Sequence, residues 1–198
     1  MSTPLLPPTP PEAPKLNSRF WPWAARFILR LSGWRLLGEL PNVPKLILIG
    51  APHSSYWDGV WGLLMKIGLG ADIKVMIKRE VVDGPLGIIL RPIGMIPINR
   101  SAALNVVGQM VKRFTESERM WLGITPEGTR KKVRHWKSGF LRIALEANVP
   151  IQTIFIDYPT KTFTFGPVVH ATTDHDADMV KIRELFTPYR GKHRNAND

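Results

Sequence analysis

The chain of 198 residues contains 27 Lys and Arg against 16 Asp and Glu, which gives a formal net charge of +11, and it contains no cysteine. The missing cysteine excludes disulfides, thiolate zinc sites and a cysteine nucleophile. The positive charge favours a polyanionic partner, such as nucleic acid, an anionic membrane surface or a phosphorylated substrate, and this length predicts one domain.

The first 40 residues predict two segments ahead of the main domain. Residues 1–14 hold six prolines and predict a disordered Pro-rich tail. Residues 15–40 predict an amphipathic helical segment, because large apolar side chains recur at helical spacing. They are Phe20, Trp23, Phe27, Leu31 and Trp34, with Arg19, Arg26 and Arg30 along one edge of that face. Such a basic, Trp-rich helix suits a membrane interface; the alternative is a helix whose Trp face packs on the domain core.

The next stretch, Lys45 to Asp58, joins a short apolar strand to a helix and carries a pair of polar residues. His53 follows the strand, and Asp58 lies in the first turn of a helix capped by Ser54 or Ser55. If His53 folds back over that turn, the carboxylate can hold one imidazole nitrogen and leave the other free as a base. The alternative is that His53 caps the helix and Asp58 is an ordinary first-turn carboxylate.

Strands and helices alternate through the rest of the chain. The predicted strands are 73–77, 95–98, 119–124, 150–157 and 161–165, and the predicted helices are 56–67, 102–114, 139–147 and 174–188. This order predicts an α/β fold with a mixed, partly parallel central sheet flanked by helices. Residues 41–189 then form the main domain and 190–198 a polar, frayed tail. The acidic run 174–178 indicates a helix start rather than a metal site.

Two further strands end in groups that can bind a phosphate. Arg100 follows the strand that ends at residue 98, and the strand that ends at residue 124 leads into Glu127, Gly128, Thr129 and Arg130. Arginine offers forked donors for a phosphate, and a glycine lets the backbone approach a ligand closely. Glu127 can accept a hydrogen bond from a hydroxyl or hold an arginine in position. One basic loop is usually a solvated surface, but three polar sites at the ends of alternating strands favour a functional site.

In order and spacing, these motifs resemble those of the glycerophospholipid acyltransferases, the lysophosphatidic acid acyltransferase (PlsC-like) family, in its short bacterial form. The resemblance covers about residues 45–165 and rests on four blocks: His53-x4-Asp58, Gly94 to Arg100, Glu127 to Arg130, and Val149 to Ile151. It implies that His53 is a general base with Asp58 as its partner, and that Val149 to Ile151 belongs to the acyl-binding side. It also implies a set of substrate-binding residues: Arg100, Glu127, Gly128, Thr129 and Arg130.

The activity that this resemblance implies is transfer of a fatty acyl group from acyl-CoA or acyl carrier protein to the hydroxyl of a lysophospholipid such as 1-acylglycerol 3-phosphate. Such a reaction needs no metal and no resident cofactor. No run reaches the ~18–20 apolar residues of a membrane span, and no signal peptide is recognised. We therefore expect a peripheral enzyme on the cytoplasmic side of an anionic membrane, with no nucleic-acid partner. Two alternatives remain: a lipid or thioester hydrolase that uses the same site, and a non-catalytic basic membrane-surface protein.

Overall fold

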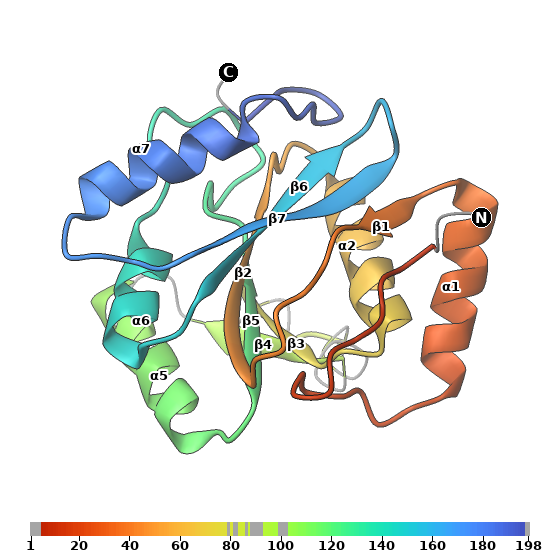
Figure 1. Ribbon diagram of the computed structural model, residues 1–198, viewed down its shortest axis with the longest axis horizontal. Coiled ribbons are helices and arrows are strands. Elements are labelled where there is room, and N and C mark those ends of the chain that lie inside the picture. Colours follow the sequence, from red (N-terminus) through yellow and green to blue (C-terminus); the bar gives the residue numbers. More distant parts are fainter. Residues whose placement is uncertain are drawn as a thin grey trace.

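The protein is built on a seven-stranded sheet with helices on both faces (Figure 1), and the computed structural model describes residues 5–78, 80, 83–85, 87, 93–98 and 103–196. In sheet order, the strands are β1 (Arg35–Leu37), β7 (Thr162–Val169), β6 (Ile151–Asp157), β2 (Lys45–Ala51), β5 (Met120–Ile124), β3 (Ile73–Lys78) and β4 (Met95–Ile98). From β6 to β4 all neighbours are parallel, whereas β7 pairs antiparallel to β6 and β1 lies parallel to β7. The predicted α/β class with a mixed, partly parallel sheet is confirmed.

The helices form two layers, one on each face of the sheet (Figure 1). One layer holds α1 (Phe20–Ser32) and α2 (Tyr56–Leu69); the other holds α5 (Ala103–Glu116), α6 (Gly139–Ala147) and α7 (His175–Phe186). Successive strand residues point to opposite faces, so β2 contributes to both layers. Ile47 and Ile49 pack in the cluster with α5, α6 and α7, and Leu46 and Leu48 pack in the cluster with α1 and α2. The central strand is thus buried on both sides, as a parallel sheet requires.

The predicted N-terminal helix is shorter than its apolar pattern indicated. It ends at Ser32 because Gly33 adopts a left-handed conformation, with φ of 77°, and caps the helix. Trp34 then turns into the core, where its ring stacks on Trp61 at 5.4 Å between centroids. The prediction that Trp34 shares a face with Phe27 was therefore wrong, and the edge strand β1 was missed.

The N-terminal residues 5–14 differ from the predicted disordered tail. The carbonyl oxygen of Leu5 accepts a hydrogen bond from the amide of Leu36 (3.0 Å), and that of Pro14 accepts one from the amide of Asp72 (2.8 Å). Ala13 is fully buried in the cluster with α1 and α2. Proline prevents regular structure in this segment, but its few apolar side chains still bury surface against the domain.

At the far end of the chain, the predicted helix start is confirmed. Asp174 is the N-cap of α7, and its carboxylate accepts a hydrogen bond from the amide of Ala177 at 2.9 Å. The predicted frayed tail lies against the sheet in its described part, because Ala196 is buried in the cluster with α5, α6 and α7.

Candidate active site

The carboxyl ends of three neighbouring strands carry the predicted polar residues. β2 lies between β5 and β6 in the sheet, and α6 connects β5 to β6 across it. These strand ends point to the upper edge of the sheet in Figure 1. In open α/β sheets, a crevice forms where connections leave a strand in opposite directions, and ligands bind there. His53 follows β2, the loop 125–138 follows β5, and Tyr158 follows β6.

A turn after β2 sets the start of α2. The chain passes through a cis peptide bond between Ala51 and Pro52, and Ser55 becomes the N-cap of α2. The Ser55 hydroxyl accepts a hydrogen bond from the amide of Trp57 at 3.2 Å. In return, Asp58 Oδ2 accepts hydrogen bonds from the amides of Ser54 and Ser55, both at 2.7 Å. This reciprocal arrangement gives partners to backbone amides at the helix start that have none within the helix, and it confirms the predicted cap.

The same carboxylate contacts the imidazole. His53 Nδ1 lies 3.2 Å from Asp58 Oδ2, so His53 does fold back over the first turn of α2. The Asp58 side chain is 1% exposed, while that of His53 is 19% exposed and reachable from solvent. Burial alone would raise the pKa of Asp58, but hydrogen bonds from His53, Tyr158 and the helix-start amides outweigh it and hold that pKa below its ordinary value. Asp58 is therefore both a helix-start carboxylate and the partner of His53.

Glu127 lies beneath His53 and is fully buried, with a side-chain exposure of 0%. Both of its carboxylate oxygens lie 3.1 Å from the His53 amide, which donates to them. Oε2 also accepts a hydrogen bond from Arg194 Nη2 at 2.6 Å. Burial raises the pKa of Glu127 above its ordinary value despite these donors. The Glu127 side chain thus faces the protein backbone and Arg194 and supports the His53 turn.

The rest of the loop after β5 reaches the surface. Gly128 has φ of 67°, in the left-handed region, and a Cβ there would lie 2.8 Å from Lys137 Cε. Thr129 Oγ1 accepts a hydrogen bond from the Lys131 amide at 3.3 Å. The Arg130 guanidinium is exposed and stacks over the ring of Tyr56, with its carbon 3.3 Å from the ring centroid. The structure therefore brings His53, Asp58 and the residues 127–130 to one edge, where Arg130 offers an exposed positive charge.

Arg100 lies outside the described residues. One other predicted group does not join this arrangement. Val149 and Ile151, which the resemblance assigned to the acyl-binding side, are buried in the core at the amino end of β6. Ile151 pairs with Ile47, whereas the pair next to His53 is Ala51 with Phe155, at the opposite end of the strands.

Sequence reasoning missed two residues of this site. Tyr158 Oη donates a hydrogen bond to Asp58 Oδ1 at 2.5 Å. Arg194 Nη2 donates to the His53 carbonyl oxygen at 2.9 Å as well as to Glu127. The position of Tyr158, directly after a strand that neighbours β2, is a signal that could have pointed to it. Arg194 stands in a polar terminal stretch that carries no recognisable pattern.

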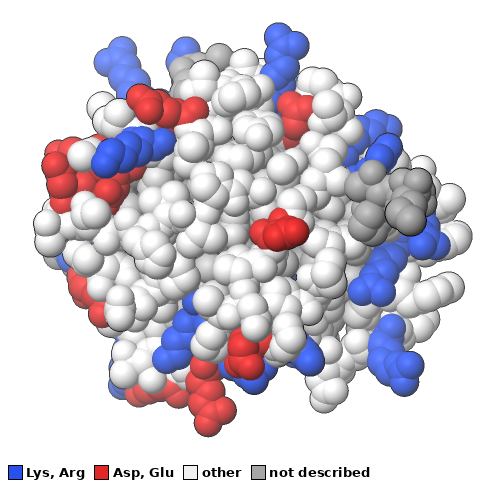
Figure 2. Space-filling model, in the orientation of Figure 1, with Lys and Arg blue, Asp and Glu red and all other residues white. Residues whose placement is uncertain are grey.

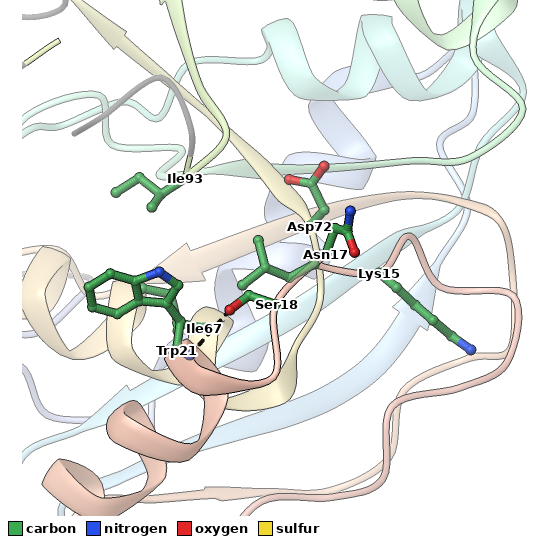
Figure 3. A pocket seen from close by; sticks show the side chains of 8 residues that line it. Lys15, Asn17, Ser18, Trp21, Ile67, Asp72 and Ile93 are labelled. Carbon is green, nitrogen blue, oxygen red and sulfur yellow. Dashed lines mark hydrogen bonds between the residues drawn. The ribbon is translucent and has the colours of Figure 1, made fainter. Parts of the chain in front are cut away.

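A separate pocket lies at the other end of the sheet. It has a volume of about 430 Å³ and is lined by residues 15–18, Trp21, Ile67, Asp72 and Ile93. Figure 3 shows Trp21 and Ser18 at the start of α1, with Asp72 and Asn17 across from the indole. Since Ile67 is near the end of α2 and Asp72 precedes β3, this pocket is on the edge opposite His53.

The outer face of α1 is apolar and uncovered. Phe20, Trp21, Trp23, Phe27 and Leu31 are each more than half exposed, while Pro22, Ala25 and Leu29 are buried against the domain. In Figure 2, the right-hand edge, where α1 lies, presents uncharged side chains with Lys and Arg among them. None of the helices in the described part of the chain combines the length and the apolar character needed to cross a bilayer.

Comparison with known proteins adds a family and a fold. Residues 38–157 match the protein family described as Acyltransferase. Among solved structures, the fold is similar to that of the 1-acyl-sn-glycerophosphate (LPA) acyltransferase PlsC from Thermotoga maritima, with a TM-score of 0.61, 14% sequence identity, and coverage of 84% of this chain and 75% of that one. A comparison with curated protein sequences gave no match. The family match includes His53 and Glu127 and ends just before Tyr158.

Proposed function

The chain belongs to the acyltransferase family, and from this premise we propose that it transfers a fatty acyl group from acyl-CoA or acyl carrier protein to the hydroxyl of a lysophospholipid, with 1-acylglycerol 3-phosphate as the acceptor. The observation that carries this proposal is the imidazole of His53, part exposed at a strand end and held at Nδ1 by the buried Asp58 carboxylate. This arrangement leaves Nε2 as the nitrogen available to a substrate.

The proposed reaction is a direct transfer. His53 Nε2 takes the proton from the acceptor hydroxyl as its oxygen attacks the thioester carbonyl carbon. The C–S bond then breaks, and the imidazolium returns the proton to the leaving thiolate. A carboxylate beside Nδ1 favours the tautomer with its proton on Nδ1 and stabilises the imidazolium while it exists. Asp58 suits this role because its lowered pKa keeps it ionised at neutral pH.

The acceptor's phosphate would bind at the cationic end of the loop that follows β5. Arg130 is exposed there, and its guanidinium carbon lies 3.3 Å from the centroid of the Tyr56 ring. A planar guanidinium fixed in this way offers two parallel donors to a phosphate. We assign Arg100 to the same role on the basis of the family motif. Gly128 and Thr129 shape the turn that presents Arg130 and complete the proposed binding loop.

The exposed face of α1 would place the enzyme on a membrane. Aromatic residues favour the interface between lipid and water, and basic residues favour anionic head groups. Residues 15–38 contain five basic residues and no acidic one. At the start of α2, Tyr56 and Trp57 are also well exposed, within four residues of His53 in the sequence. We therefore propose peripheral binding to an anionic membrane surface, which brings lipid acceptors close to the site.

One assay separates this proposal from its alternatives. The purified protein is mixed with isotope-labelled acyl-CoA or acylated carrier protein and a panel of phosphorylated and unphosphorylated lysolipids, and the products are identified by mass spectrometry. We expect labelled diacyl product, formed best with 1-acylglycerol 3-phosphate, and a loss of roughly 10²–10⁴-fold in His53→Ala. Free labelled fatty acid as the His53-dependent product would instead indicate a hydrolase. No turnover with any donor, together with vesicle binding, would indicate a non-catalytic surface protein.

A further inference from the structure

We propose that Arg194, on the segment after α7, is a positioning residue of the active site: it holds Glu127 against the backbone of His53 and ties the His53 turn to the Arg130 loop. This inference rests on the proposed acyl transfer for its kinetic test but not for its structural one. Arg194 lies beyond the residues that match the family.

The contacts of the Arg194 guanidinium join two loops that carry proposed site residues. Nη2 donates to Glu127 Oε2 at 2.6 Å and to the His53 carbonyl oxygen at 2.9 Å, and Nε donates to the Arg130 carbonyl oxygen at 3.3 Å. The Arg194 and Glu127 side chains are 12% and 0% exposed, so this ion pair is shielded from solvent. A rigid fork of donors is needed to reach all three acceptors at once, which a single ammonium group cannot reproduce.

The segment that carries Arg194 is docked against the same strand ends. The Arg190 amide donates to Asp157 Oδ1 at 3.0 Å, and the Arg190 carbonyl oxygen accepts from the Tyr158 amide at 2.9 Å. The His193 amide donates to Ser54 Oγ at 3.2 Å. A side chain at Gly191 would place its Cβ 2.3 Å from the Arg194 carbonyl oxygen and 2.8 Å from Ser54 Oγ, so the segment is closely packed there.

The His53 backbone is thus held from two directions. Its amide donates to Glu127, and its carbonyl oxygen accepts from Arg194. The groups that face the Glu127 carboxylate are the Arg194 guanidinium from the terminal segment and His53 from the turn after β2. Without Arg194, His53 alone among the described groups opposes the effect of burial on Glu127, so Glu127 binds a proton at higher pH. A protonated Glu127 accepts a weaker hydrogen bond from the His53 amide, and the imidazole then loses its fixed position over Asp58.

The test compares three variants of the full chain. Arg194→Gln removes the fork and its charge, and Arg194→Lys keeps the charge without the fork. Arg190→Gln is the matched control, because it removes one positive charge from the same segment while its backbone bonds to Asp157 and Tyr158 stay. We expect kcat of Arg194→Gln to fall about 10–100-fold with KM changed less than about 3-fold, since a small misplacement of a reacting group lowers the rate this much. Arg194→Lys should be intermediate, and Arg190→Gln should stay within about 2-fold of wild type.

Two further readouts distinguish positioning from general support of the fold. The acid limb of the pH–rate profile should move to higher pH in Arg194→Gln and stay in place in Arg190→Gln. Amide hydrogen exchange at His53, followed by NMR without substrate, should be faster in Arg194→Gln and unchanged in Arg190→Gln. If Arg194→Gln does not fold, the same measurements are made on Arg194→Lys and compared with Arg190→Gln.

Other outcomes overturn the inference. Wild-type kcat in a folded Arg194→Gln or Arg194→Lys, with an unmoved acid limb, would show that the contacts do not position His53. If the wild type transfers no acyl group, the proposed function fails, yet His53 exchange still decides the structural claim. Exchange in Arg194→Gln equal to that in Arg190→Gln would then overturn it.

Discussion

The hydroxyl of Tyr158 lies 2.5 Å from Asp58 Oδ1, while His53 Nδ1 lies 3.2 Å from Oδ2 of the same carboxylate. The two oxygens of Asp58 therefore contact different side chains, Oδ1 that of Tyr158 and Oδ2 that of His53. Burial and the neighbouring Asp58 carboxylate raise the pKa of Tyr158, so the phenol keeps its proton and remains a donor. With the helix-start amides also on Oδ2, the carboxylate plane is fixed in the orientation that His53 needs.

Tyr158→Phe should weaken this arrangement without removing either member of the pair. The variant loses one charge-assisted hydrogen bond, and we expect kcat to fall roughly 3–10-fold and the free energy of unfolding to fall by about 1–2 kcal/mol. Initial rates with saturating acceptor and urea unfolding measure the two effects. Tyr189→Phe is the control, because it deletes a hydroxyl from a ring that stacks on Phe155 at 4.2 Å between centroids. Equal rates in both variants would mean that Tyr158 does not orient Asp58.

Asp58→Asn should reduce both the rate and the stability, and the stability effect should depend on pH. The folded pKa of Asp58 is lower than its ordinary value of 3.8, so its contribution is complete above that value and is lost as the pH falls through the lower folded pKa. We expect the variant to be less stable than wild type by about 2–3 kcal/mol at pH 7. Urea unfolding at a series of pH values down to about 3 should show this difference shrinking.

The rate of Asp58→Asn should fall by roughly 10²-fold or more, since the imidazolium loses its counter-charge. His53→Ala serves as the comparison, because it removes the base but keeps the α2 cap. A stability difference that stays constant across the pH series would contradict the ionised state of Asp58 in the folded protein. A normal rate would reduce Asp58 to a helix-start residue.

Arg130→Ala should act on the acceptor rather than on the chemical step. If Arg130 grips the phosphate, its loss should raise KM for a phosphorylated acceptor about 10-fold or more and leave KM for the acyl donor nearly unchanged. Lys132→Ala removes an exposed positive charge two residues away and is the matched control. Arg100→Ala should resemble Arg130→Ala. A KM for 1-acylglycerol 3-phosphate that matches the control would show that Arg130 only packs on Tyr56.

The α1 face can be tested by point substitutions on vesicles. Trp23→Ser with Leu31→Ser removes two large side chains that are 64% and 75% exposed, and we expect binding to anionic vesicles to weaken. The expected loss is about 10-fold or more, since a buried large apolar side chain contributes about 1.5–3 kcal/mol. Val168→Ser with Val180→Ser is the control, because both valines are exposed elsewhere, on β7 and α7.

Salt should weaken the vesicle binding further, because arginines attract anionic lipid and ions screen that attraction. Deletion of the whole N-terminal region is a poor test, since Leu29 and Trp34 belong to the core and their loss would unfold the domain. Equal co-sedimentation of the Trp23 and Val180 double variants would place the membrane contact on another surface.

Much of the fold could be predicted from local patterns. The apolar run of β2 and the serine cap of α2 are signals that neighbouring residues carry by themselves, so most helix and strand positions were predicted closely, although the end of α1 at Gly33 was missed. β1 could not be predicted in this way, because its three residues form a strand only through their pairing with Thr162 to Thr164 of β7. The terminal segments were predicted to be disordered or frayed from their polar and proline-rich composition. Composition does not reveal the backbone hydrogen bonds that hold these segments against the domain.

The site was predictable where its chemistry is local. His53 and Asp58 meet within one turn, so spacing and a helix cap were enough to bring them together. Glu127 was predicted to bind substrate or to hold an arginine, and only the sheet order reveals that it lies beneath the His53 backbone. Tyr158 and Arg194 lie 100 and 67 residues from the carboxylates they contact. Contacts at that separation depend on strand order, which the sequence alone does not specify.

The place of β2 in both hydrophobic clusters has a consequence for how the protein fails on heating. Unfolding of β2 would disrupt the packing on both faces of the sheet, so the strand that precedes His53 belongs to the part of the protein that unfolds last. Terminal segments, in contrast, unfold locally at a low free-energy cost. We expect the Arg194 segment to detach first, which leaves the sheet folded but His53 no longer positioned for catalysis. Thermal inactivation should therefore occur several degrees below the melting of the domain, and it should reverse on cooling. Residual activity measured in parallel with circular dichroism during a slow temperature ramp would show the two curves separated.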